Sequence, residues 1–187
     1  MSKMEHITSI SELINRLHDC DDEEECKKLV KLIDIPLDEY GPYMHFSSKH
    51  YTRNCIARTD RFELLLLCWE HEQETPIHCH NEQECWVYVV EGSFAELRYS
   101  KDIKQQEGLE LKNELSLNEE RISYMNDDMG FHSLINTNPN GRSMSLHLYM
   151  SPIDECRVYN EGREEFELKE LEYYSYQGKI LQKEDLK

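Results

Sequence analysis

The sequence predicts a mainly β protein, in which an antiparallel β-barrel carries a small helical layer at its N-terminus. From residue 51 onward, short runs that are apolar or alternate between apolar and polar residues recur at fairly regular spacing. The preceding residues instead carry apolar side chains at helical spacing. Only seven glycines and five prolines occur among 187 residues, so long disordered linkers are not expected. We expect one domain over residues 1–187, with helices in about 8–40 and the barrel in about 45–175.

Two helices are expected in the N-terminal layer. In residues 8–20, four apolar residues recur at helical spacing: Ile10, Leu13, Ile14 and Leu17. Thr8 or Ser9 can cap this helix, because a side-chain oxygen there accepts from a free backbone N–H. The second helix is expected in residues 21–33, whose acidic start and basic middle suit the helix dipole. The acidic run at 21–25 is better explained as a solvated helix start than as a cation site.

The strands are expected in nine runs that are separated by polar turns. These runs cover residues 62–69, 85–92, 93–99, 109–115, 122–126, 131–136, 143–150, 156–160 and 165–171. Neither an internal repeat nor a low-complexity segment is evident. Many short strands at such spacing fit a sandwich or a barrel.

Composition and charge exclude several classes of function. The net charge of -17 repels phosphate backbones and anionic lipid headgroups, so neither nucleic acid nor a membrane surface is an expected partner. No apolar run approaches the ~20 residues that cross a bilayer, and MSKMEHITSI has no secretory-signal pattern. Seven cysteines without a C-x-x-C pair indicate free thiols in a reducing compartment. We therefore expect a cytoplasmic protein and, without an obvious apolar surface stripe, a monomer.

Three histidines form the candidate metal site. His78 and His80 stand two residues apart in PIHCHNEQECWVYVVEG, and on a strand such residues point to one face. His132 lies in the later segment MGFHSLIN, which supplies a third imidazole from another strand. A lone H-x-H pair is a weak signal, and a lone histidine is more often a satisfied core residue. As a set, however, neutral imidazoles suit a transition metal such as iron.

These two segments resemble the two metal-binding motifs of the cupins. The first motif has an H-x-H pair, an acidic residue and a terminal Gly, and here Gly92 closes it while Cys85 takes the acidic position. The second motif has a Gly, a His and an Asn, matched by Gly130, His132 and Asn136, although this Gly lies one residue closer than usual. The resemblance implies a cupin-type jelly roll. Three neutral ligands would leave iron(II) its full charge, which suits an anionic thiolate and leaves room for an amine and O2.

Several blocks in the same order resemble the cysteine dioxygenase family and cover roughly residues 10–160. They are YTRN at 51–54, LLLLCW at 64–69, Cys85, YMNDDMGFH at 124–132 and SLHLY at 145–149. The resemblance implies that His78, His80 and His132 hold a single Fe(II). It also implies that the chain oxidises L-cysteine with O2 to L-cysteine sulfinic acid, the first step of cysteine catabolism and part of taurine biosynthesis.

The resemblance assigns roles to further residues. Arg53 would hold the substrate carboxylate with its forked guanidinium, assisted by Tyr51. Without the family, a surface Arg in a turn would be preferred. Ser145, His147 and Tyr149 alternate in SMSLHLYM and would share one strand face. The resemblance implies a hydrogen-bonded row in which His147 orients Tyr149, and Tyr149 donates to the substrate or to bound oxygen.

Cys85 and Tyr149 correspond to a pair that forms a thioether bond in some family members, so this crosslink is possible here. Trp69 resembles a tryptophan beside the family's pocket, although core packing explains it equally well. Cys156 is interpreted as a pocket-edge or structural thiol. Met150 and Ser151 stand where the family often has Ser-Pro after the Tyr, and a cis bond before Ser151 would cost roughly 3 kcal/mol. This departure leaves the placement of Tyr149 and His147 open.

Four alternatives differ in their predicted substrate or class. Relatives that oxidise 3-mercaptopropionate tend to carry Gln where this chain has Arg53, so Arg favours cysteine. Cysteamine and N-terminal cysteine lack a carboxylate close to the thiol for Arg53 to bind. A non-catalytic cupin would be expected to lose ligands or the Ser-His-Tyr row. A cupin sugar isomerase would normally keep a carboxylate ligand, and Cys85 stands in that position.

Overall fold

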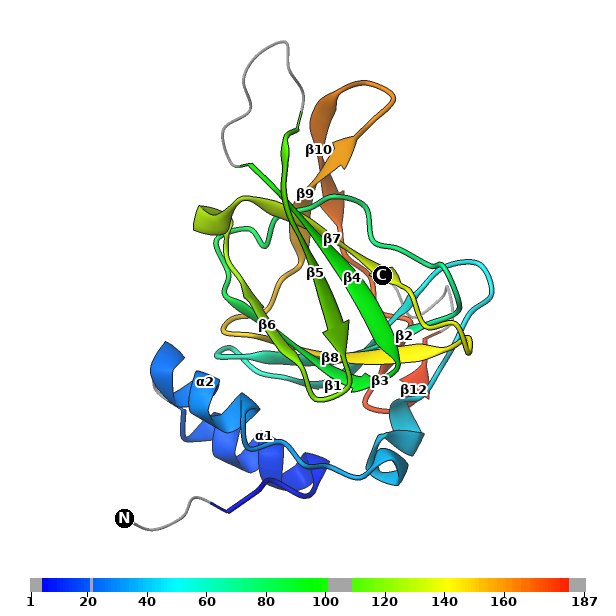
Figure 1. Cartoon of the computed structure of the whole chain (residues 1–187). Coiled ribbons are helices and arrows are strands. Elements are labelled where there is room, and N and C mark those ends of the chain that lie inside the picture. Colours follow the sequence, from blue (N-terminus) through cyan, green and yellow to red (C-terminus); the bar gives the residue numbers. More distant parts are fainter. Residues whose placement is uncertain (1–4, 21, 101–108, 182–187) are drawn as a thin grey trace.

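The N-terminal layer contains two short α-helices, α1 (Ile10–His18) and α2 (Glu23–Val30), and the 3-10 helix η1 (Leu37–Tyr43) follows them. The structure is a computed structural model that describes residues 5–20, 22–100 and 109–181 (Figure 1). Ser9 caps α1 by accepting from the Glu12 N–H, as predicted. Asp22 caps α2 in the same way, so the described part of the acidic run acts as a helix start. Asp21 itself lies outside the described residues.

The barrel is built from a seven-stranded sheet, a three-stranded sheet and a two-stranded hairpin. The large sheet has the order β12-β11-β1-β2-β8-β3-β6. Its strands are β1 (Thr52–Arg58), β2 (Glu63–Trp69), β3 (Cys85–Glu91), β6 (Ile122–Met125), β8 (Ser143–Tyr149), β11 (Ser175–Tyr176) and β12 (Lys179–Ile180). The smaller sheet, of order β5-β4-β7, contains β4 (Ser93–Tyr99), β5 (Leu111–Asn118) and β7 (Phe131–Asn136). The hairpin pairs β9 (Glu155–Asn160) with β10 (Glu165–Glu170).

Each of the nine predicted runs contains a strand, but the sequence did not predict β1, β11 or β12 as separate strands. β1 mixes the polar residues Thr52, Arg53 and Asn54 with apolar ones, and all three are buried, so its pattern does not alternate. β11 and β12 are two residues each, which is too short for a periodic signal. The pairing is antiparallel except between β1 and β11, which run parallel.

Strand β2 is apolar on both faces, and each face packs into a different hydrophobic core. Leu64 and Leu66 pack with the helices, whereas Leu65, Leu67 and Trp69 pack inside the barrel. This division follows from the two-residue period of a strand, because both faces of β2 are covered. The helices lie against one outer face of the barrel (Figure 1).

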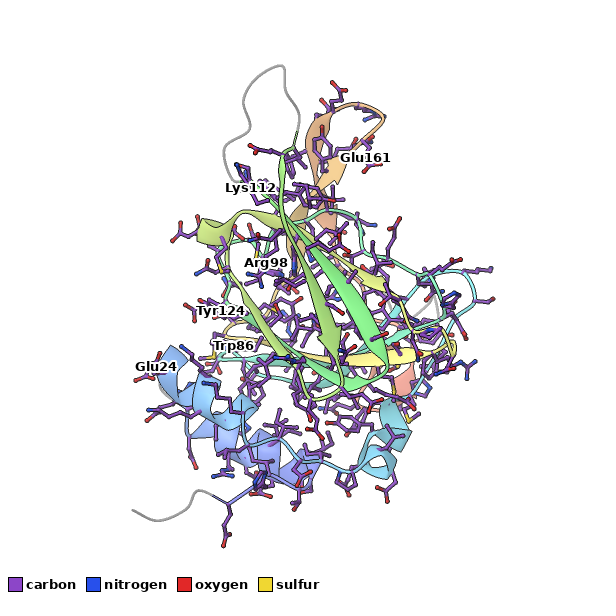
Figure 2. The ribbon with its side chains drawn as sticks, in the orientation of Figure 1. Glu24, Trp86, Arg98, Lys112, Tyr124 and Glu161 are labelled. Carbon is purple, nitrogen blue, oxygen red and sulfur yellow. The ribbon has the colours of Figure 1, made fainter. Side chains whose placement is uncertain are left out.

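The packing between the helical layer and the barrel continues onto β3. Figure 2 shows Trp86 on the side of the barrel that faces the helices, and its ring lies 5.1 Å from that of Tyr124 on β6. The predicted fold, a mainly β jelly-roll barrel of the cupin type with a small N-terminal helical layer, is confirmed. No helix in the described part of the chain combines the length and apolar character that crossing a membrane requires.

Candidate active site

The imidazoles of His78, His80 and His132 converge inside the barrel. Their candidate ligand atoms all lie within 4.8 Å of one another, and the Nε2 atoms of His80 and His132 are 3.0 Å apart. His132 is on β7, and the backbone of His78 pairs with it through two hydrogen bonds. The H-x-H pair does not lie on a regular strand, because His78 forms only isolated bridges, to His132 and to Val158. The segment is extended enough to bring both side chains to one point.

Hydrogen bonds on the outer nitrogens orient two of the rings. His78 donates from Nδ1 to the Pro76 carbonyl at 2.9 Å, which leaves its Nε2 as the free lone pair. His132 donates from Nδ1 to Glu96 Oε1 at 2.8 Å, with the same result. Nδ1 of His80 is buried without a hydrogen-bond partner in the described structure. Three such lone pairs in a buried site fit a divalent transition metal, which would satisfy them together.

Burial also keeps the imidazoles of His78 and His80 neutral. It lowers the pKa of His78 to about 3, and the neighbouring charge of His132 contributes to this shift. The pKa of His80 falls well below its usual range for the same reasons. A neutral imidazole is the form that binds a metal, so the site is ready for an ion at neutral pH.

Glu96 supports His132 from behind and was not predicted from the sequence. Its carboxylate is fully buried on β4 and also accepts from Ser123 Oγ at 2.6 Å and Arg98 Nη2 at 3.1 Å. Burial alone would raise the pKa of this carboxyl, but the contacts with His132, Ser123 and Arg98 lower it to about 2. The sequence did offer one signal for this role: Glu96 lies on the same strand face as buried Phe94, and an acid that points into the core needs hydrogen-bond or charge partners there.

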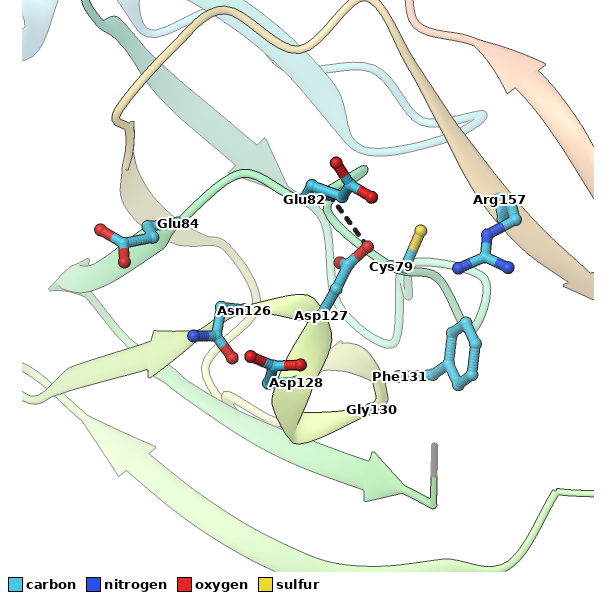
Figure 3. Close-up of a pocket in the computed structure, with 9 residues that line it drawn as sticks. All are labelled: Cys79, Glu82, Glu84, Asn126, Asp127, Asp128, Gly130, Phe131 and Arg157. Atoms are coloured by element: carbon cyan, nitrogen blue, oxygen red, sulfur yellow. Dashed lines mark hydrogen bonds between the residues drawn. The ribbon is translucent and has the colours of Figure 1, made fainter. Parts of the chain in front are cut away.

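Asp127 ties the two histidine segments together. Its Oδ1 accepts from the backbone N–H of His80 at 2.7 Å, and its Oδ2 accepts from that of Glu82 at 2.9 Å (Figure 3). The intervening backbone is strained, because Asn81 and Glu82 have φ of 51° and 65°. Asp127 belongs to the short 3-10 helix η2 (Asp127–Met129), which leads through Gly130 to His132.

The hollow in Figure 3 lies behind the histidine segment. It measures about 560 Å³, and its lining includes Cys79, Asp127 and Arg157. None of the residues proposed from the sequence to bind substrate lines this hollow. This hollow therefore lies beside Asp127, which holds the His80 segment in place, and it is not the proposed substrate cavity.

A separate cavity of about 650 Å³ brings the predicted substrate residues together. Six of the residues singled out from the sequence line it: Tyr51, Arg53, His78, His147, Tyr149 and Cys156. Trp69, Ser145 and Cys85 are buried behind its wall. One ligand candidate, His78, and the predicted carboxylate clamp thus line one cavity, although β1, β8 and the loop before β3 are distant in sequence.

The predicted row on β8 is only partly hydrogen-bonded. Trp69 Nε1 donates to Ser145 Oγ at 3.0 Å, and Ser145 Oγ bonds to His147 Nε2 at 2.9 Å. His147 and Tyr149 do not bond directly, since their rings stack with centroids 6.4 Å apart. His147 Nδ1 instead lies 4.0 Å from Cys85 Sγ, and Cys85 links the row to Tyr149. Tyr149 instead lies 5.8 Å from the ring of His80. Tyr51 stacks on Trp69 at 4.7 Å, which gives Trp69 both a packing and a hydrogen-bonding role.

Arg53 is a buried residue and not a surface arginine. Its Nη1 donates to the Glu172 carbonyl at 3.4 Å, and its guanidinium lies over the ring of Tyr173, 5.4 Å from the centroid. Nη2 is 3.6 Å from Glu63 Oε2 but forms no hydrogen bond among the described residues. A cavity-lining arginine with a free N–H can receive a carboxylate.

Cys85 and Tyr149 are direct cross-strand partners on β3 and β8, and their side chains hydrogen-bond. Burial raises the pKa of both groups. The Met150–Ser151 departure does not displace this region, since His147 and Tyr149 both lie on β8. The described residues contain no cis peptide bond.

The chain is similar to several known proteins. The sequence model of a family described as cysteine dioxygenase type I matches residues 2–162. The chain is 28% identical to cysteine dioxygenase type 1 of Rattus norvegicus over 159 residues, 82% of this chain and 80% of the rat protein. It is 26% identical to that of Danio rerio over 177 residues, 91% of this chain and 88% of the fish protein. A Klebsiella pneumoniae protein with a double-stranded β-helix domain aligns with TM-score 0.47 at 17% identity, covering 59% of this chain and 80% of that one.

Proposed function

Because the chain belongs to the cysteine dioxygenase type I family, we propose that it is an iron(II)-dependent dioxygenase that converts L-cysteine and O2 to L-cysteine sulfinic acid. Membership of this family implies an oxidoreductase of the dioxygenase type, with cysteine and O2 as substrates. The cofactor, the substrate and the residue roles that follow are proposed for this chain. We also propose a cytoplasmic monomer, which sedimentation at micromolar concentration would test.

The observation that carries the proposal is the unpartnered Nη2 of Arg53 in the cavity that His78 also lines. The Nη2 group of the buried Arg53 guanidinium can donate a hydrogen bond to an acceptor, and a substrate carboxylate would supply that acceptor. L-Cysteine carries a carboxylate, an amine and a thiol within a few bonds. A substrate held at Arg53 can therefore present its sulfur and nitrogen toward the three imidazoles.

His78, His80 and His132 would hold a single Fe(II), which when bound supplies open positions for a thiolate, an amine and O2. Glu96 and Asp127 keep the imidazoles in place through His132 and the His80 backbone. Arg53 fixes the carboxylate, and positioning of this kind accounts for much of the rate of a reaction between bound partners. The apolar walls from Leu67, Leu134 and Ile153 exclude water from the same cavity.

Tyr149 is proposed to donate a hydrogen bond to the substrate or to its oxygen. Its burial and the neighbouring Cys85 raise its pKa, so the phenol keeps its proton at neutral pH. His147 is proposed to orient Tyr149 through Cys85, because its Nε2 bonds to Ser145 Oγ and its Nδ1 lies 4.0 Å from Cys85 Sγ. Cys156 lines the cavity as a buried thiol.

The test is oxygen uptake after anaerobic reconstitution with Fe(II), with L-cysteine and 3-mercaptopropionate run in parallel and the sulfinate identified by mass spectrometry. We expect cysteine turnover that is lost in His132→Ala and weakened in Arg53→Ala. Preferential oxidation of 3-mercaptopropionate would support the alternative substrate. Absence of sulfinate from both thiols, with iron bound, would support a non-catalytic metal-binding cupin instead.

A further inference from the structure

Glu63 is a buried acid directly behind the proposed carboxylate clamp. It begins β2, its side chain is 0% exposed, and its Oε2 lies 3.6 Å from Arg53 Nη2. That contact is an ion pair without hydrogen-bond geometry, so it acts through charge more than by holding the guanidinium in place. The hydroxyl of Tyr173 donates to the other oxygen of Glu63.

A second arginine contacts Glu63, but it has its own partner. Arg58 Nη1 lies 3.4 Å from Glu63 Oε1, whereas its distances to the Asp154 carboxylate are 2.8 Å from Nη1 and 2.9 Å from Nη2. The hydrogen bonds to Asp154 raise the pKa of Arg58 and take up its charge. Arg58 also donates to Glu63 at 3.4 Å, so both arginines face the charge of Glu63, and these two arginines and two acids sum to zero.

The remaining charged groups around the cavity do not restore a positive field. Lys169, Glu170 and Glu172 line it together with Arg53, so the lining holds two cations and two anions. His50, His78 and His147 also line it. With Glu63 behind this wall, the protein groups around Arg53 do not form a net cationic pocket.

We propose that Glu63 is a specificity-determining residue that compensates the charge of Arg53. Arg53 can still donate a hydrogen bond to a carboxylate, but the cavity does not favour an additional negative charge. Glu63 thereby limits how strongly binding at Arg53 favours a thiol with a carboxylate, such as 3-mercaptopropionate, over a thiol without one, such as cysteamine. This inference rests on the proposed function, because it takes the cavity beside Arg53 as the site of the thiol substrate.

Two small thiols that differ in the group opposite the thiol isolate this effect. 3-Mercaptopropionate ends in a carboxylate that Arg53 can bind and cysteamine ends in an amine, so the ratio of their dissociation constants reports the charge beside Arg53. We measure both by anaerobic calorimetric titration of the iron(II)-loaded protein. Glu63→Gln should shift this ratio toward 3-mercaptopropionate by about tenfold, because like charges several ångströms apart in a partly buried site interact by that order. A general loss of structure would weaken the binding of both ligands, so its effect would cancel in the ratio of the two dissociation constants.

Glu63→Asp is the matched control, because it disturbs the same packing and keeps the charge. Its ratio should stay within about twofold of the native value, whereas an equal shift in both variants, or no shift in Glu63→Gln, overturns the proposal. If Glu63→Gln does not fold, the native protein decides, since a preference for 3-mercaptopropionate above about a hundredfold contradicts a compensated Arg53. Loss of turnover with all thiols would reject the proposed function, while the binding ratio would still decide the role of Glu63.

Discussion

Cys85 and Tyr149 occupy directly opposed positions on β3 and β8, with the thiol hydrogen-bonded to the phenol in a fully buried site. Opposed residues of antiparallel strands have Cβ atoms about 5 Å apart. The two residues are 64 positions apart in the sequence (149 minus 85). The register of the two strands, which depends on the packing of many other residues, therefore places the sulfur beside the aromatic ring. This relationship makes the crosslink between them a sharp prediction.

We expect aerobic incubation of the iron-loaded protein with cysteine to join Cys85 Sγ to the ring of Tyr149. The thiol and the ring each lose one hydrogen, with O2 as the oxidant, so the intact mass falls by about 2 Da and one tryptic peptide pair becomes covalently linked. Cys85→Ser should abolish the change, whereas Cys55→Ser, at a buried cysteine of the same core, should not. An unchanged mass after many turnovers would contradict the prediction.

Asp127→Asn should weaken metal binding by about tenfold or more, because an amide cannot accept both the His80 and the Glu82 N–H. The measurement is competition for Co(II) against a chromophoric chelator. Asp128→Asn makes the same charge change one residue away and should alter the affinity by less than about threefold. Equal weakening in the two variants would mean that charge alone, and not the clamp on the His80 segment, determines affinity.

The stability of the metal-free protein should depend on pH through His147. Burial, followed by the charges of His132 and His78, lowers its folded pKa to about 3, below the unfolded value near 6.5. The associated stability is therefore present above about pH 6.5 and is lost as the pH falls from there toward about 3.

Urea unfolding at pH 7.5 and pH 5.5 measures this effect. The native protein should lose about 1 kcal/mol more than His147→Gln between these values. His71→Gln, at a solvent-exposed position, serves as the control and should lose as much as the native protein. Identical losses in the native protein and in His147→Gln would show that His147 is not held neutral.

Ser145→Ala should lower the free energy of unfolding by about 1–3 kcal/mol. Its hydroxyl bonds to both Trp69 Nε1 and His147 Nε2, and all three side chains are buried, so its removal leaves polar atoms without partners. Ser133→Ala removes a buried hydroxyl for which the described structure gives no such pair and should cost less than about 1 kcal/mol. Chemical denaturation of both variants compares them, and equal costs would argue against the Trp69–Ser145–His147 row.

The sequence predicted the helices and most strands because their signals are local. The apolar spacing around Leu13 and the capping oxygen of Ser9 depend on a few neighbouring residues. The run containing Leu64 to Leu67 is equally evident as a buried strand. Strand β1 was missed because Arg53 is buried there, and a buried arginine is justified only by partners such as Glu172 and Tyr173, more than a hundred residues away.

The three acids that support the site could not be assigned from their own segments. Glu63 looks like the polar end of a strand and Asp127 like part of an acidic turn, while Glu96 shares a strand face with Phe94 but its segment does not show that His132 is its partner. Each acquires its role only when Arg53, His132 or the His80 backbone approaches it. Such approaches depend on strand register, which a local pattern does not encode.

By itself, the sequence determined the class of fold and the identity of the three histidines, because hydrophobic periodicity and imidazole chemistry are properties of the residues. The tertiary structure alone decided which atoms meet: Cys85 opposite Tyr149, and Arg53 beside Glu63. It also showed that His147 contacts Cys85 and does not hydrogen-bond Tyr149 directly. The physical reason is that contacts between distant segments arise from the packing and register of the whole barrel, to which every strand contributes.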